Sequence, residues 1–330
     1  MRSRAAPNLR VTALALLLTA CTQASPTPTA SPAAVSSTAS SPSATSTKPT
    51  VERSTMISVG DIACDPTSPY FEGHPGFCEQ ASVARRVGKL VDDGADWFLP
   101  LGDNQYEVGG YSAYKQVYDR SFGQFMDITE PVPGNHEYYT QGAAGYVRYF
   151  GDRAGTPDKP WRSFSPVDGW LVLLLDSNCD YVGGCGPQSE QGRWITKTLA
   201  ASDADCVMAT WHHPLQTSGE YNGNADTLAL ARPLWQLVDA GGADLVLNGH
   251  DHIYERFDKL GGVQQFTVGT GGKNPYDITT KAPGSEKAIS GRYGVLQLTV
   301  DSRGTYSYEF IATNGDVLDN GEGRCTNQPQ

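Results

Sequence analysis

The stretch Leu245–His252, LVLNGHDH, shows the pattern that decides the fold of this chain: a short apolar run passes directly into polar residues. The same pattern occurs earlier, at Thr55–Asp61 (TMISVGD), Asp96–Asp103 (DWFLPLGD) and Ala204–His213 (ADCVMATWHH). Near-continuous apolar runs of this length are typical of strands that are buried on both faces of a sheet. We therefore expect a buried strand at each of these places, with polar side chains at its carboxyl end.

Helical periodicity between these runs indicates an α/β fold. Residues Glu79–Asp92 place apolar side chains on one helical face, and Asp226–Ala240 is rich in leucine and alanine. Strands that alternate with helices predict a central sheet, and ligands of such sheets bind beyond the carboxyl ends of the strands. Residues 262–312 contain consecutive strand-like runs with few helix signals, so we expect the last strands of the chain to be antiparallel.

Composition and charge restrict the class of protein. The chain has 330 residues, of which 39% are apolar and 18% charged, and its formal net charge is −11. A chain of this length can bury a core in one or two globular units. The acidic excess argues against nucleic-acid binding, which needs a basic face. No apolar run reaches the roughly 18 residues that indicate a membrane-spanning helix.

The N-terminus carries the pattern of an export signal. The basic segment Met1–Arg10 precedes the apolar run Val11–Leu18, which predicts a signal peptide over residues 1–20. The following Leu18–Cys21, LTAC, resembles the lipobox of bacterial lipoproteins. This resemblance implies a lipid on Cys21 and an extracytoplasmic lipoprotein of a bacterium, anchored to the membrane through that lipid.

A tether is expected between this signal and the folded body. Residues 22–50 are serine, threonine, alanine or proline at every position except Gln23, Val35 and Lys48. Such a segment cannot bury enough apolar surface to offset its chain entropy. We therefore expect a flexible tether over residues 21–54 and one folded domain over residues 55–330.

Cysteine usage fits an exported protein. Apart from Cys21, the chain has an even number of cysteines, which predicts three disulfides in an oxidising compartment. Their spacing favours two local pairs and one long-range pair, although other pairings stay open. A cysteine-based zinc site is disfavoured because no CxxC pair occurs. The favoured pairs are Cys64–Cys78, Cys179–Cys185 and Cys206–Cys325.

Histidines gather at the predicted strand ends. Five of the six histidines fall in three short motifs beside aspartate and asparagine, and scattered structural histidines would not do so. Carboxylate and amide oxygens together with imidazole nitrogens exceed the needs of one tetrahedral ion. They suit two ions that share a bridging carboxylate, an arrangement used for displacement at phosphorus. The candidate ligands are Asp61, Asp103, Asn135, His212, His250 and His252.

Read in order, five motifs resemble those of the calcineurin-like metallophosphoesterases. They span residues 60–252 and are Gly60-Asp61, Gly102–Tyr106 (GDNQY), Gly134–Glu137 (GNHE), His212–Pro214 (HHP) and Gly249–His252 (GHDH). The resemblance implies an α/β fold, a four-layer αββα sandwich of two mixed β-sheets, with residues 55–330 as its catalytic domain. His74 matches none of the motifs and is expected at the surface.

One position narrows the resemblance to purple acid phosphatases. Many metallophosphoesterases have a histidine two residues after the first aspartate, but this chain has Ala63 there. Purple acid phosphatases also lack it, and they use a tyrosine three residues after the bridging aspartate, where this chain has Tyr106. A phenolate is a hard anionic ligand, which favours Fe(III) beside Zn(II), Mn(II) or Fe(II). The alternative is that Tyr106 is an aromatic residue that packs beside the site.

The resemblance implies a role for each site residue. The first ion would bind Asp61, Asp103, Tyr106 and His252, and the second would share Asp103 and add Asn135, His212 and His250. His136 would stabilise the phosphoryl group or protonate the leaving oxygen. Glu137 would orient that imidazole or form a local cap, and His213 would face substrate or pack.

The implied activity is hydrolysis of a small phosphate monoester by a metal-bound hydroxide. A phosphodiesterase or nucleotidase at the same site is the nearer alternative, because the motifs determine the metals and not the leaving group. A non-catalytic binding lipoprotein is a minor alternative, since every ligand position is filled. The repeated tyrosines Tyr111, Tyr114 and Tyr118 are expected to pack rather than to bind bases.

Overall fold

The computed structural model describes residues 50–71 and 76–326. The predicted signal peptide, the expected lipidation site Cys21, nearly all of the expected tether and His74 lie outside these residues. No helix within the described ranges is long and apolar enough to cross a membrane. Strand β1, Arg53–Val59, starts two residues before the expected start of the folded domain at residue 55, so Arg53 and Ser54 belong to the folded body.

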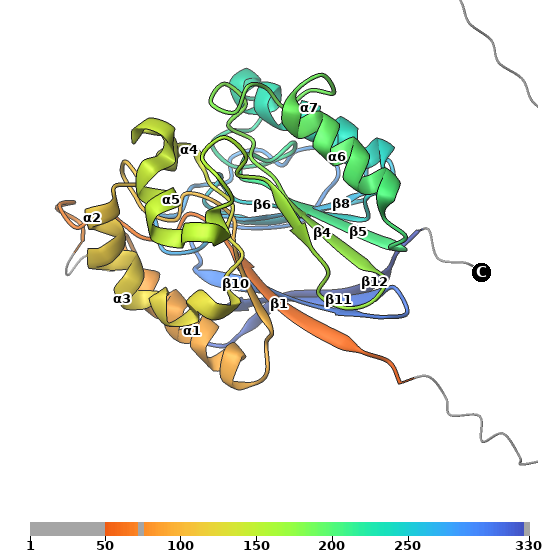
Figure 1. Cartoon of the computed structure of the whole chain (residues 1–330). Helices are drawn as coiled ribbons and strands as arrows, with labels where there is room; N and C mark the ends of the chain where they lie inside the picture. Colours follow the sequence, from red (N-terminus) through yellow and green to blue (C-terminus); the bar gives the residue numbers. More distant parts are fainter. Residues whose placement is uncertain (1–49, 72–75, 327–330) are drawn as a thin grey trace, which may run out of the picture. The chain divides into compact units, whose positions relative to one another are not determined.

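The first of two sheets has five strands in the order β12-β11-β10-β1-β2 (Figure 1). Strand β1 lies between β2, with which it pairs in parallel, and β10, with which it pairs antiparallel. The remaining pairs are antiparallel, so the sheet is mixed. Besides β1, the strands are β2 (Trp97–Pro100), β10 (Gly294–Asp301), β11 (Thr305–Ala312) and β12 (Val317–Arg324).

The second sheet has seven strands in the order β3-β4-β5-β6-β8-β7-β9. Strands β4, β5, β6 and β8 are parallel to one another, whereas β3, β7 and β9 pair antiparallel. Strand β8 lies between β6 and β7. The expectation of antiparallel strands is therefore wrong for its pairing with β6, which is parallel. The strands are β3 (Arg162–Phe164), β4 (Trp170–Leu174), β5 (Cys206–Thr210), β6 (Leu245–Asn248), β7 (Tyr254–Phe257), β8 (Gln264–Val268) and β9 (Ser285–Ile289).

The two sheets lie face to face, which confirms the expected sandwich. The rings of Tyr254 on β7 and Phe310 on β11 stack at 4.0 Å, and the Trp170 indole on β4 donates to the Asp301 carbonyl on β10. Helices α6 (Glu190–Ala201) and α7 (Ala225–Ala240) lie over the outer side of the seven-stranded sheet, and α1 (Gln80–Asp92) packs against β10 (Figure 1).

Short helices fill the long connection between β2 and β3. Tyr114 and Tyr118 are buried there against Tyr149 and Phe150, which confirms their packing role. The segments are α2 (Tyr111–Ala113), η1 (Tyr114–Tyr118), α3 (Asp119–Ser121), η2 (Gly123–Ile128), α4 (Asn135–Tyr138), η3 (Gln141–Ala143), α5 (Ala144–Phe150) and η4 (Gly151–Ala154).

Three disulfides join the cysteines in the favoured pairing. Cys64–Cys78 and Cys179–Cys185 close local loops, and Cys206–Cys325 links β5 to the residue that follows β12. The long-range bridge therefore connects the two sheets near the C-terminus. Removing such a link costs about 2–5 kcal/mol of stability in small exported domains.

Candidate metal centre

The polar residues converge where β1, β2, β5 and β6 end. Asp61 follows β1 and Asp103 follows β2, and main-chain hydrogen bonds continue between the two segments past the strands. His212 and His250 follow β5 and β6 of the other sheet. The His250 amide donates to Asp61 Oδ2 at 2.8 Å, which joins the ends of the two sheets. The structure therefore brings these four strand ends together.

The chain backbone is strained at three of these positions. Asp61, Asp103 and His250 have φ angles of 61°, 48° and 72°, in the left-handed region that side chains other than glycine rarely adopt. Each such residue costs about 1 kcal/mol or more, and such strain collects at functional sites. Gly134 allows the chain to pass close to Asp103, because a Cβ on this residue would lie 2.1 Å from Asp103 Oδ1.

Tyr106 lies between the two carboxylates. Its hydroxyl is 2.9 Å from Asp61 Oδ1, 3.1 Å from Asp103 Oδ2 and 3.0 Å from His252 Nε2. Burial, followed by the charges of Asp103 and Asp61, raises the pKa of Tyr106 well above its usual range. A phenolate here would face two carboxylates in a buried site, so its formation requires a cation at this point.

Two imidazoles are oriented by carbonyl groups. His212 Nδ1 donates to the Leu101 carbonyl at 2.9 Å, and His252 Nδ1 donates to the Asn274 carbonyl at 2.6 Å. Both Nε2 atoms then face the carboxylates, 3.3 Å from Asp103 Oδ2 and 3.3 Å from Asp61 Oδ1 respectively. A histidine whose one ring nitrogen is held by a carbonyl, with the other directed at carboxylates, is the usual arrangement of a metal ligand.

The electrostatics of the centre favour positive charge. Burial alone would lower the pKa of His212, but Asp103 and Asp61 raise it to about 9. Burial alone would raise the pKa of Asp103, but His212 and His136 hold the pKa of this carboxyl well below its usual range. The two neighbouring carboxylates therefore create a site in which a cation is strongly stabilised.

Asn135 and His136 approach from the other side, at the start of α4. The His136 amide donates to Asp103 Oδ1 at 2.9 Å, which places both residues beside the Asp103 carboxylate. The His136 Nδ1 donates to the Glu107 carbonyl at 2.5 Å, and its Nε2 lies 3.8 Å from Asp103 Oδ2. Its side chain is 20% exposed, whereas His212, His250 and His252 are buried. His136 is thus the imidazole that a substrate can reach.

The rings of His250 and His213 pack against each other at the centre. Their rings lie 4.4 Å apart, and Ser177 Oγ lies 2.7 Å from His213 Nδ1. Burial and the neighbouring His212 lower the pKa of His213 to about 3. Of the two roles considered for His213, the structure shows packing.

Glu137 does not orient His136, contrary to one of the two roles expected for it. It is fully buried and caps its own helix by accepting from the Gly134 amide at 2.7 Å. It also accepts from the amides of Asp103, Asn104 and Gln105 and from the Tyr114 hydroxyl. Burial, with the charge of Asp103, raises the pKa of Glu137 to about 8. Glu137 therefore fixes the loop that carries Asp103 and Tyr106.

The residues present fit a group of bound cations. Ligand atoms of Asp61, Asp103 and His212 lie within 4.8 Å of one another. Two more polar atoms, His212 Nε2 and Asn135 Oδ1, are buried and have no hydrogen-bond partner among residues 50–71 and 76–326. Buried polar atoms normally have a hydrogen-bond partner, and binding to a metal ion would account for the lack of one at these two atoms.

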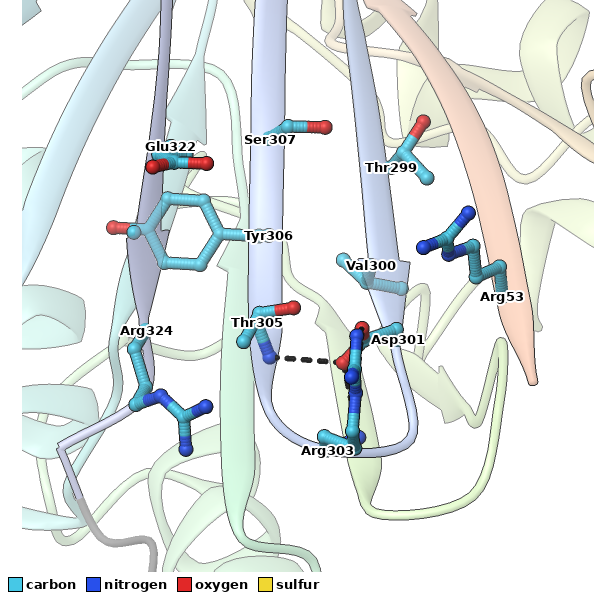
Figure 2. A pocket seen from close by; sticks show the side chains of 11 residues that line it. Arg53, Thr299, Val300, Asp301, Arg303, Thr305, Tyr306, Ser307, Glu322 and Arg324 are labelled. Carbon is cyan, nitrogen blue, oxygen red and sulfur yellow. Dashed lines mark hydrogen bonds and ion pairs between the residues drawn. The ribbon is translucent and has the colours of Figure 1, made fainter. Parts of the chain in front are cut away.

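A separate groove of about 680 Å³ lies at the other end of the five-stranded sheet (Figure 2). Arg53, Arg303 and Arg324 project into it from three different parts of that sheet. Arg53 starts β1 and Asp61 follows its end, so the groove and the centre are about 25 Å apart along an extended strand. The groove therefore has no part in the centre.

This architecture and this centre define the class of protein, a phosphate-ester hydrolase of the two-sheet metallophosphoesterase fold. Residues 58–254 match the calcineurin-like phosphoesterase family, and the chain belongs to this family.

Purple acid phosphatases are among the proteins to which the chain is similar. It is 25% identical over 282 residues to purple acid phosphatase 17 of Arabidopsis thaliana, covering 74% of this chain and 77% of that protein. It is 26% identical over 284 residues to tartrate-resistant acid phosphatase type 5 of Homo sapiens, covering 78% and 84%.

Two solved structures share the fold. Purple acid phosphatase PPD1 of yellow lupin superposes with a TM-score of 0.64 at 18% identity, over 82% of this chain and 53% of that one, so this chain spans about half of the lupin enzyme. GAP50, the anchor in the inner membrane complex of Plasmodium, also superposes with a TM-score of 0.64, at 17% identity over 84% and 90%.

Proposed function

We propose that the protein hydrolyses phosphate monoesters at a centre of two metal ions. The observation that carries this proposal is the position of Tyr106, whose hydroxyl lies within 3.1 Å of both Asp61 and Asp103 and 3.0 Å from His252. The acid phosphatases among its relatives support the same activity. Such an arrangement suits a hard, highly charged ion, and Fe(III) with Zn(II), Mn(II) or Fe(II) is the proposed pair.

We assign the ligands according to these contacts. Asp61, Tyr106 and His252 form one group around the first position, and Asn135, His212 and His250 form the other. Asp103 belongs to both, because its Oδ2 lies 3.1 Å from the Tyr106 hydroxyl and 3.3 Å from His212 Nε2. The unsatisfied Asn135 Oδ1 and His212 Nε2 support the second group.

The two ions, when bound, would activate water and neutralise charge on the phosphate. The remaining chemistry is that of the protein. Because His136 Nδ1 donates to the Glu107 carbonyl, its Nε2 faces the centre and can hold a proton for the leaving oxygen. Lys273 lies 4.4 Å from the centre of the Tyr106 ring and makes an ion pair with Glu107. The lysine next to Tyr106 is therefore neutralised by Glu107.

The test of this activity is a comparison of substrates on purified protein of residues 50–330, loaded with iron and zinc. The proposal predicts release of phosphate from phenyl phosphate and much slower hydrolysis of bis-phenyl phosphate, in both cases abolished by a chelator. Equal or faster cleavage of the diester would contradict the monoester specificity. No cleavage of either compound would contradict the activity itself.

We also propose that the protein is an extracytoplasmic lipoprotein, attached to the membrane through Cys21. The LTAC motif and the serine-, threonine- and proline-rich segment after it support this location. Three disulfides fit an oxidising compartment. Mass spectrometry of the full chain expressed in a bacterium should detect a lipid on Cys21, and the Cys21→Ser variant should leave the membrane fraction. An unmodified Cys21 would contradict the proposal.

A further inference from the structure

Two tyrosines outside the sequence motifs pack directly on two histidines of the centre. The ring of Tyr276 stacks on His252 with centroids 3.9 Å apart and planes within 10°. The ring of Tyr221 lies 4.0 Å from His250, tilted by 33°. The two tyrosine rings are 6.3 Å apart, and both residues are half-buried. They therefore form one aromatic surface beside the centre.

The loop of Tyr221 is fixed by the centre itself. Asp251, between the two histidines, accepts from the Thr217 hydroxyl at 2.6 Å and from the amides of Glu220 and Tyr221 at 2.9 and 3.2 Å. Gly219 is required there, because a Cβ on it would lie 2.3 Å from Asp251 Oδ1. Tyr221 is consequently held in place and is not on a loop free to move away.

The loop of Tyr276 is fixed in the same manner. The Tyr276 amide donates to the His252 carbonyl at 3.1 Å. The carbonyl of Asn274, two residues earlier in the chain, accepts from His252 Nδ1. The two loops also bind each other, since Asn222 Nδ2 donates to the Thr280 carbonyl at 3.0 Å. Both rings are thus preorganised, which lowers the entropy that a ligand would otherwise lose on ordering them.

We propose that Tyr221 and Tyr276 form a wall that binds a flat aromatic leaving group of the phosphate ester. This inference rests on the proposed function, because it concerns the alcohol part of the substrate of the same centre. Each ring packs on an imidazole and is only half-buried, so part of its surface stays accessible. A group esterified to a phosphate at the centre would lie beside the two histidines on which these rings pack. Esters of aromatic alcohols are the substrate class that this wall selects.

The experiment compares two esters that differ in flatness and hardly at all in leaving-group basicity, benzyl phosphate and cyclohexylmethyl phosphate. The metal-loaded protein should have the higher kcat/KM for the benzyl ester, by about tenfold. Tyr221→Leu and Tyr276→Leu should each lower this ratio by about fivefold, the effect of losing one aromatic pair. Tyr221→Phe and Tyr276→Phe keep the rings and should keep the ratio.

Tyr181→Leu is the matched control. Tyr181 is 60% exposed and stacks on Tyr138 at 4.7 Å, so it is an accessible tyrosine in another ring pair. This variant should leave the ratio unchanged. A ratio near one in the unmodified protein would overturn the proposal. Equal losses for both esters in the leucine variants would also overturn it, because the rings would then only position the histidines.

A binding measurement separates this proposal from the proposed activity. Calorimetry with benzylphosphonate and cyclohexylmethylphosphonate, which cannot be hydrolysed at the C–P bond by this chemistry, reports recognition alone. Tighter binding of the benzyl compound that is lost in Tyr276→Leu supports the wall even if neither ester is cleaved, a result that would contradict only the activity. Equal affinities, or no binding of either phosphonate, would overturn the wall.

Discussion

The two ends of the five-stranded sheet hold acidic side chains under opposite conditions. At the end of β1, Asp61 and Asp103 are buried beside Tyr106 without a lysine or arginine partner among the described residues. At the other end, Asp301 is paired with Arg303 at 2.7 Å, in an open groove (Figure 2). In the groove an arginine pairs with the carboxylate, whereas the two buried carboxylates of the centre have, within the described part of the chain, only hydroxyl, amide and histidine partners. Two adjacent buried carboxylates, and not the size of a hollow, mark the functional end.

The largest effect should follow from removing the shared carboxylate. Asp103→Asn keeps the shape of the side chain but removes the charge that both groups of ligands contact. We expect loss of at least one metal ion per chain and a fall in kcat/KM of about 10³-fold, since metal ions supply several kcal/mol of transition-state stabilisation.

The control for this variant lies at the opposite end of the sheet. Asp301→Asn makes the same chemical change and should leave both the metal content and kcat/KM as they are. Metal analysis and phenyl phosphate kinetics on both variants make the comparison. Equal losses of activity in the two variants would remove the distinction between the two ends.

A smaller effect is expected at His136, which contacts the centre without joining either group of ligands. His136→Asn should lower kcat by about 10²-fold, within the usual range for loss of a general acid. The metal content should stay unchanged. Loss of metal together with activity would show instead that His136 is a ligand.

The smallest effect concerns the pH dependence of stability at the groove. Burial alone would raise the pKa of Asp301, but hydrogen bonds from Arg303 and Thr305 lower it to about 2. A carboxyl whose pKa is lower in the folded state stabilises the fold above its unfolded pKa, and this stabilisation is lost as the pH falls toward the folded value.

Asp301→Asn should therefore reduce the free energy of unfolding by about 1 kcal/mol at pH 6, after allowance for screening by solvent. The difference from the unmodified protein should shrink by roughly half at pH 3. Urea unfolding at both pH values measures it. A difference that grows as the pH falls would have the wrong sign for this explanation.

Much of the fold could be predicted from the sequence because its signals are local. Apolar runs that end in Asp61, Asp103, His212 and His250 indicated which strand ends would meet, and the cysteine spacing favoured the observed disulfides. The insertion of β8 between β6 and β7 could not be predicted, because strand order depends on packing between distant segments.

The residues around the centre were harder to predict for the same reason. The capping role of Glu137 follows from its spacing to Gly134, but its hydrogen bonds to the amides of the Asp103 loop join segments more than 30 residues apart. Tyr221 and Tyr276 lie in loops with no periodic pattern, and only the fold brings their rings onto the histidines. Contacts of this kind leave no trace in local sequence.

Metal analysis and visible spectroscopy of the protein and its Tyr106→Phe variant test whether Tyr106 is a ligand of a two-metal centre. We expect bound iron and a phenolate-to-Fe(III) charge-transfer band that disappears in the variant. A colourless protein that holds two equivalents of zinc or manganese, and keeps both without the Tyr106 hydroxyl, would contradict this expectation.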